Sequence, residues 1–312
     1  MTASFIRPPR LSAGCTLGVV APSSPIRGDR LDRGLEALRA MGFRVVVADH
    51  VHDRWGYLAG LDECRAADLS QFFARSDIDG IVCARGGYGA ARMLEHVDWD
   101  SVRARPKVFI GFSDITTLHV AMERRAGLIT FHGPMVTTLA DPCSEACLQT
   151  LFRAVTGPEP MGEVNDPDRP TQTLVGGCAR GRLAGGCLTL LCSAVGTADP
   201  QDFADRIVVL EDTDEPLYRV DRFLTQLRGS GLLQRAAGFV VGTSSHWDRY
   251  PEANHGFTLR DIWEQLLAPL GKPTVLGFPI GHVESPLTLP LGCMAELDAD
   301  HGTLVITEPA VA

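Results

Sequence analysis

The segment KVFIGFSDITTLHVAMERRAGLITFHGP, residues 107–134, contains the pattern that decides the fold. Residues 107–112 form a short apolar run typical of a buried strand, and residues 115–127 have the character of a helix that ends at a glycine. A second apolar run, residues 128–134, follows directly. This strand–helix–strand succession, with continuous apolar strands, predicts a parallel sheet covered by helices on both faces.

The same alternation extends back to the start of the chain. Apolar runs at residues 15–22, 43–49 and 80–85 predict strands, and the segments 31–42 and 61–76 between them predict helices. In the first of these helices, leucines recur at helical spacing before a terminal glycine. The first half of the chain is therefore expected to form one α/β domain.

The composition changes at residues 157–173, which are rich in proline, glycine and aspartate. We interpret this stretch as a linker between an N-terminal domain, residues 1–156, and a C-terminal domain, residues 174–312. The second domain again mixes predicted strands, such as RIVVLED at 206–212, with helices. Its last strands are expected to form a hairpin around Asp298–Gly302.

Length and charge restrict the function classes. A chain of 312 residues, 45% hydrophobic, can bury a large core and suggests about two domains. Its net charge of −9, without a long basic run, argues against a nucleic-acid or anionic membrane surface as partner. No segment approaches the roughly 20 apolar residues of a membrane helix, and no signal peptide is evident, so a cytoplasmic protein is expected.

The nine cysteines form no C-x2-C pair, so neither disulfides nor a zinc site are expected.

Ser113 lies where the predicted strand turns into the predicted helix. Ligands bind at the carboxyl ends of strands in open α/β sheets, and a sharp turn after Gly111 would project the hydroxyl outward as a nucleophile. The Asp114 N–H could then face an oxyanion. Ile115 departs from the usual G-x-S-x-G pattern of such turns. The alternative is that Ser113 or Asp114 only caps the helix.

A nucleophilic serine needs a base and a group that orients the base. His119 lies within the predicted helix and is interpreted as structural. His132 ends a strand of the same domain and could line the site, whereas His282 lies in a loop framed by glycine and proline. Glu211 and Asp212, at the end of a strand, are the candidate carboxylates, with a cap or turn as the alternative.

Paired glycines follow the strand at residues 80–85 in the stretch ARGGYGAARML. Gly86 and Gly87 allow the backbone to approach a ligand closely and to turn N–H groups toward negative charge. The stretch lacks the glycine patterns of dinucleotide and P-loop sites, so an oxyanion or carboxylate cradle is as compatible as a nucleotide site. Arg85 could pair with a substrate carboxylate or form a surface salt bridge.

Eight stretches in one order along the chain resemble the LD-carboxypeptidase family of serine peptidases, which includes muramoyltetrapeptide carboxypeptidase and the microcin C immunity peptidases. The resemblance covers almost the whole chain. The stretches are GVVAPSSP (18–25), GYLAGLDECRAADL (56–69), CARGGYGAARML (83–94), GFSDITTLH (111–119), TFHGPM (130–135), GRLAGGCLTLL (181–191), VVLEDTDEPLYRVDRFLTQLR (208–228) and GFPIGH…LTLPLG (277–292).

The resemblance implies a catalytic triad with Ser113 as nucleophile, His282 as base and Glu211 as the acid that orients it. It gives the N–H groups of Asp114 and of Gly86 or Gly87 the role of an oxyanion hole. The implied fold is α/β, with a flavodoxin-like parallel-sheet N-terminal domain and a smaller C-terminal α/β domain with a mixed sheet. The site would lie in the cleft between the domains.

The resemblance also implies the reaction. The family removes the terminal D-alanine from a murein tetrapeptide by cutting an L,D amide bond, during cytoplasmic peptidoglycan recycling. It needs no metal or cofactor, and its members are often homodimers. Cys187 stands where most relatives have asparagine, which puts the shape of the site in question. Cys187 has no matched base and is not expected to be a nucleophile.

Two other functions remain as alternatives. A peptidase of the microcin C immunity type would cut an acyl linkage to a nucleotide, and Trp247 could then stack on the base, although a surface aromatic is the simpler interpretation. A non-catalytic protein with two lobes that close on a small ligand is the other alternative. It predicts that Ser113, His282 and Glu211 do not converge.

Overall fold

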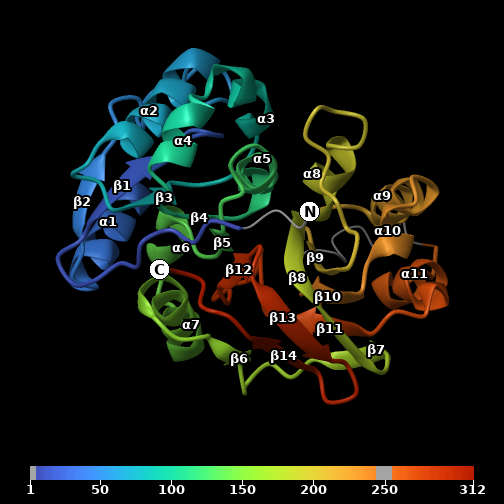
Figure 1. The fold of residues 1–312 in the computed structure, drawn as a ribbon. Coiled ribbons are helices and arrows are strands. Elements are labelled where there is room, and N and C mark those ends of the chain that lie inside the picture. The colour runs from blue at the N-terminus through green and yellow to red at the C-terminus, as the bar shows by residue number, and fades with distance from the viewer. Residues whose placement is uncertain (1–4, 244–254) are drawn as a thin grey trace.

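The computed structural model describes residues 5–243 and 255–312 and contains two β-sheets, each covered by helices. Figure 1 shows the two sheets side by side, with the N-terminal half of the chain in blue and green around one and the C-terminal half in yellow to red around the other. None of the helices in the described ranges is both long and apolar enough to cross a membrane.

The first sheet has six strands in the order β12-β5-β4-β3-β1-β2. Strands β1 to β5 are parallel, and their order 2-1-3-4-5 is that of a flavodoxin-like sheet, which confirms the predicted class. The strands are β1 Thr16–Val20, β2 Arg44–Val47, β3 Gly80–Cys83, β4 Val108–Gly111, β5 Thr130–His132 and β12 Leu289–Leu291. The connecting helices are α1 Arg30–Ala40, α2 Asp62–Ala74, α3 Ala90–Met93, η1 Leu94–His96, α4 Trp99–Ala104, η2 Ser113–Ile115, α5 Thr116–Ala126, α6 Val136–Leu139 and α7 Glu145–Thr156.

The C-terminal half of the chain contributes one strand to this first sheet. Strand β12 pairs antiparallel with β5, with Leu289 opposite His132 and Pro290 opposite Phe131. Proline is tolerated there because β12 is an edge strand. The otherwise parallel sheet therefore has one antiparallel edge, and this edge ties the two halves of the chain together.

The second sheet has eight strands in the order β6-β14-β13-β8-β9-β10-β11-β7. Strands β8 to β11 are parallel and the flanking strands are antiparallel, so the predicted mixed sheet is confirmed. The strands are β6 Gly162–Val164, β7 Gln172–Val175, β8 Cys178–Cys187, β9 Arg206–Glu211, β10 Gly238–Gly242, β11 Thr274–Phe278, β13 Met294–Asp298 and β14 Thr303–Ile306. The helices are α8 Leu188–Ser193, α9 Leu217–Gly229, α10 Leu232–Arg235, α11 Leu259–Leu266 and η4 Ala268–Leu270.

The segment 157–173, interpreted from its composition as a linker, contains strand β6 and the start of β7. These two strands form the opposite edges of the second sheet, and the chain between them crosses the sheet from one edge to the other (Figure 1). Its prolines and glycines therefore belong to the turns that flank two short edge strands, where such residues are tolerated.

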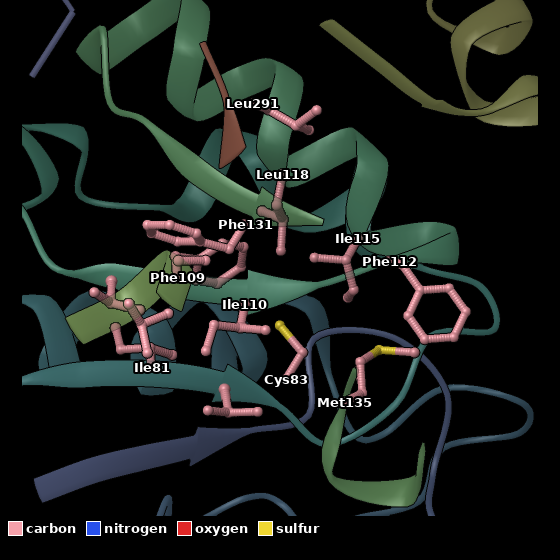
Figure 2. Packing of buried hydrophobic residues seen from close by; sticks show 14 of the residues in the cluster. Ile81, Cys83, Phe109, Ile110, Phe112, Ile115, Leu118, Phe131, Met135 and Leu291 are labelled. Carbon is pink, nitrogen blue, oxygen red and sulfur yellow. The ribbon is translucent and has the colours of Figure 1, made fainter. Parts of the chain in front are cut away.

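The largest hydrophobic core lies against the first sheet. Phe109 and Ile110 on β4 and Phe131 on β5 are almost completely buried, because parallel strands are covered by helices on both faces. Figure 2 shows them packed with Leu118 from α5 and Leu291 from β12. The strand ends that carry the candidate site residues are thus held by a continuous packed core.

Candidate active site

Ser113 occupies a strained turn between β4 and α5. Its φ is +66°, in the left-handed region that side chains other than glycine rarely adopt. Its side chain makes no capping hydrogen bond to the helix. The Asp114 carboxylate instead accepts hydrogen bonds from Ser23 Oγ at 2.6 Å and from the Ala90 N–H at 2.8 Å. The geometry is therefore that of a turn that presents the serine hydroxyl, and the capping alternative is not supported.

His282 and Glu211 approach Ser113 from the second domain. His282 Nε2 lies 3.0 Å from Ser113 Oγ, and His282 Nδ1 lies 2.7 Å from Glu211 Oε2. Glu211 is the last residue of β9, and His282 follows β11 in a loop. Gly281 has a φ of +73°, and a Cβ there would lie 2.1 Å from Glu211 Oε2. Only glycine lets the loop pass this close to the carboxylate.

The charges of Glu211 and His282 stabilise each other. Burial is the largest single influence on Glu211 and raises its pKa, but the attraction of His282 and the contribution of His132 bring the pKa down to about 2. Burial likewise lowers the pKa of His282, but attraction and hydrogen bonding by Glu211 raise it above its ordinary value. The buried carboxylate therefore stays ionised and favours the imidazolium form of His282.

Gly86 lies against the candidate nucleophile. A Cβ on Gly86 would lie 2.8 Å from Ser113 Cβ, 3.0 Å from Ser113 Oγ and 3.3 Å from the Asp114 nitrogen. Gly87 has a φ of +117°, which disfavours any other residue. The double glycine after β3 thus allows its backbone to approach the serine turn, as an oxyanion hole built from Asp114 and these glycines would require.

Replacing Gly86 by alanine is expected to lower kcat/KM about 100-fold, because the added methyl group would displace the Ser113 side chain. The matched control is Gly229→Ala, at the end of α9, where a Cβ would meet no atom within 4 Å. Circular dichroism should show both variants folded, and steady-state kinetics should show the loss only in Gly86→Ala. Unchanged activity of Gly86→Ala would contradict the close packing of these two turns.

His132 and His119 are buried behind the site. His132 is 0% exposed, so the interpretation of His132 as a direct substrate contact is corrected. Its Nε2 lies 3.6 Å from Glu211 Oε1, and these two atoms make no hydrogen bond in the structure. His119 lies against Thr130 Oγ1 at 2.8 Å and the Gly111 carbonyl at 2.9 Å, and burial lowers its pKa to about 3. His119 therefore has the structural role predicted from its place in a helix.

Cys187 lies beside the site but is buried. Its N–H donates to Thr116 Oγ1 at 3.0 Å, and its Sγ lies 3.5 Å from Asp212 Oδ1. Burial, followed by the nearby carboxylates of Asp212 and Glu211, raises the pKa of the thiol far above its ordinary range. A thiol whose pKa is raised in this way remains protonated near neutral pH, which disfavours Cys187 as a nucleophile.

The site opens into a pocket of about 420 Å³. Sequence reasoning found its catalytic candidates but missed Phe112, whose ring packs edge-on against that of His282 with the ring centroids 5.1 Å apart. It also missed two arginines, Arg27 on the loop before α1 and Arg30 at the first residue of that helix. Within the described ranges, no group of histidine, cysteine and acidic residues is arranged to hold a metal ion, and all nine cysteines are free. The lining residues come from both halves of the chain and include Arg27, Arg30, Arg85, Gly86, Gly87, Phe112, Ser113, Met135 and His282.

The fold and the site together define a two-domain α/β protein whose cleft joins a serine, a histidine and a glutamate. Models of the LD-carboxypeptidase N-terminal and C-terminal domains match residues 17–133 and 180–297. A Streptomyces coelicolor protein assigned to the carboxypeptidases is 44% identical over 98% of both chains. The murein tetrapeptide carboxypeptidase of Pseudomonas aeruginosa is 34% identical, over 91% of this chain and 93% of that protein. The chain therefore belongs to the LD-carboxypeptidase family.

Two solved structures share this fold. The structure of MccF in complex with glutamyl sulfamoyl guanosine matches with a TM-score of 0.90 at 23% identity, covering 98% of this chain and 99% of that one. The muramoyltetrapeptide carboxypeptidase from Oxalobacter formigenes matches with a TM-score of 0.80 at 27% identity, covering 94% and 99%. Both comparisons span both domains, so the two-domain α/β fold is shared as a whole.

Proposed function

We propose that the protein is a serine carboxypeptidase that removes the terminal D-alanine from murein tetrapeptide by hydrolysing an L,D amide bond, in cytoplasmic peptidoglycan recycling. The observation that carries the proposal is the continuous contact from Ser113 Oγ through His282 to Glu211, at 3.0 and 2.7 Å. Membership of the LD-carboxypeptidase family supports the reaction class. The relative from Pseudomonas aeruginosa, named for murein tetrapeptide, supports the substrate.

In this mechanism Ser113 Oγ attacks the carbonyl carbon of the amide while His282 Nε2 accepts its proton. The resulting oxyanion accepts hydrogen bonds from the Asp114 N–H and from the N–H of Gly86 or Gly87. The tetrahedral intermediate collapses, the C–N bond breaks, and His282 returns the proton to the departing amine of D-alanine. A water molecule, deprotonated by His282, then hydrolyses the ester on Ser113. Glu211 holds the imidazole tautomer and stabilises the imidazolium throughout.

The activity is expected to have an acid limb set by His282, because only neutral imidazole can accept the serine proton. Glu211 raises the pKa of His282, so kcat/KM should reach half its maximum at a pH above that of an unperturbed histidine. Activity is lost as the pH falls through this value. A pH profile of kcat/KM for the tetrapeptide measures the limb. A midpoint below that of an unperturbed histidine would contradict the ion pair.

A second candidate function is favoured by the likeness to MccF bound to glutamyl sulfamoyl guanosine. A peptidase of that type would cut an acyl linkage to a nucleotide. Trp247, the candidate base-stacking residue, lies outside the described residues. The non-catalytic alternative predicts no convergence of the three side chains and is disfavoured by their contacts.

The two substrates can be compared directly. The purified protein is incubated with murein tetrapeptide and, separately, with glutamyl sulfamoyl guanosine, and products are identified by mass spectrometry. We expect release of one alanine from the tetrapeptide, with a kcat/KM well above that for the sulfamoyl compound. Cleavage of the sulfamoyl compound alone would favour the second function. Cleavage of neither would overturn both.

A further inference from the structure

Three arginines line the same pocket as the catalytic serine. Arg27 and Arg30 come from the loop before α1 and from its first residue, and Arg85 precedes the double glycine. This is a local accumulation of positive charge in a chain whose net charge is −9. The pocket is also lined by Asp141 and Glu284. The positive charge left in the pocket therefore depends on which arginines these two carboxylates already neutralise.

The Asp141 carboxylate is already paired with arginines other than Arg27 and Arg85. It forms ion pairs with Arg30 at 2.5 Å and with Arg33 at 2.7 Å, so one negative charge is shared by two guanidinium groups. Glu284 is exposed and forms no ion pair with another residue that the structure describes. The pocket carboxylates therefore leave Arg27 and Arg85 without a fixed counter-charge among the residues that the structure describes.

Arg85 is the more constrained of these two arginines. It is half-buried, and its Nη1 donates a hydrogen bond to the Pro25 carbonyl at 3.3 Å. Burial, followed by the charges of Arg27 and Arg30, lowers its pKa. A half-buried cation without a fixed counter-charge, beside Arg27, which also lacks one among the described residues, is unfavourable until an anion enters the pocket. The arrangement is therefore that of a site prepared for an anionic ligand group.

The position of Arg85 indicates which anionic group it would meet. Arg85 Nη2 lies 3.6 Å from where a Cβ on Gly87 would be, and Gly86 lies against Ser113. The guanidinium is thus next to the glycines proposed to hold the oxyanion of the scissile carbonyl. In a peptide, the terminal carboxylate carbon lies only about 3–4 Å from the scissile carbonyl carbon. A carboxylate at the end of a diaminopimelate side chain lies roughly 6–8 Å away.

We propose that Arg85, supported by Arg27, binds the free α-carboxylate of the residue that leaves, and so restricts the enzyme to the last bond of a peptide. This inference rests on the proposed function and identifies the free α-carboxylate as the group of the substrate that the pocket recognises. An internal peptide bond presents a neutral amide at the same place and would leave Arg85 unpaired. The same subsite would also accept an acidic sulfamoyl or phosphoryl group attached to the leaving nitrogen.

The test compares two tetrapeptides that differ only at the C-terminus, one ending in D-alanine and the other in D-alaninamide. Wild-type protein is expected to cleave the acid about 100-fold better in kcat/KM, because the amide lacks the charge that Arg85 binds. Arg85→Gln should lower kcat/KM for the acid by about the same factor and change the amide by less than about 3-fold. Arg85→Lys, which keeps the charge, should recover part of the preference.

The matched control is Arg39→Gln on the exposed surface of α1, which should leave both substrates unaffected. If Arg85→Gln lowered kcat/KM equally for the acid and the amide, Arg85 would instead stabilise the oxyanion or the folded structure. The carboxylate subsite would then be overturned, while the proposed function would stand. Equal cleavage of both peptides by the wild type would also overturn it. If the wild type cleaved neither peptide but cleaved glutamyl sulfamoyl guanosine, the proposed function would fail and the terminal-carboxylate assignment with it.

Discussion

Ser113→Ala protein is expected to fold normally and to turn over murein tetrapeptide about 10⁴–10⁶-fold more slowly than the wild type. Removing the nucleophile leaves only the contribution of substrate binding and of the oxyanion donors. KM should change little, because the pocket walls are intact. Stopped assays with quantified D-alanine measure kcat down to this level. A loss smaller than about 10-fold would contradict nucleophilic attack by Ser113.

The strain at Ser113 provides a control that does not depend on activity. An alanine at φ +66° retains the unfavourable left-handed conformation, whereas glycine adopts it freely. Ser113→Gly is therefore expected to be more stable than Ser113→Ala by about 1 kcal/mol, although both are inactive. Denaturant unfolding of the two variants measures this difference. Equal stability would show that the turn is not held under strain.

Glu211→Gln is the second variant with a large expected effect, a fall in kcat of about 10³–10⁴-fold. The neutral amide can still contact His282 Nδ1, but it no longer stabilises the imidazolium that forms as Ser113 loses its proton. The pKa of His282 should fall as well, so the acid limb of the pH profile moves to lower pH. Steady-state kinetics across the pH range measures both effects.

The matched control for this variant is Glu264→Gln, a carboxylate on α11 that is about half exposed and pairs with Arg260. It should leave kcat and the acid limb unchanged. Stability should also respond to Glu211, whose folded-state pKa is depressed to about 2. Its contribution is present above the pKa of an unfolded glutamate and is lost as the pH falls toward about 2. A Glu211→Gln protein with wild-type kcat would contradict the triad.

Local pattern predicted the elements that carry the site. The strand predicted over residues 107–112 contains β4, and the helix predicted over residues 115–127 contains α5, because a buried parallel strand and a helix have distinct periodicities. The alternation of strands and helices gave the parallel sheet in the same way. The positive φ at Ser113 had no such signal, since serine at a strand–helix junction is also an ordinary cap residue. The nucleophile assignment therefore came from the resemblance.

Features that depend on distant parts of the chain were not predictable. The pairing of β12 with β5 and the use of β6 and β7 as the two edges of the second sheet join segments far apart in sequence. The burial of His132 follows from the same packing. Arg27 resembles any solvated arginine in a polar loop, and only the fold places it beside Arg85. A charged loop residue can be assigned to a binding site only when the residues that surround it in the fold are known.

The central claim is tested most directly by D-alanine release from murein tetrapeptide, measured side by side for wild-type and Ser113→Ala protein by mass spectrometry. We predict that the wild type releases one alanine per peptide and leaves a tripeptide, while the Ser113→Ala protein leaves the tetrapeptide intact over the same period. Equal release by the two proteins would contradict the assignment of Ser113 as the nucleophile.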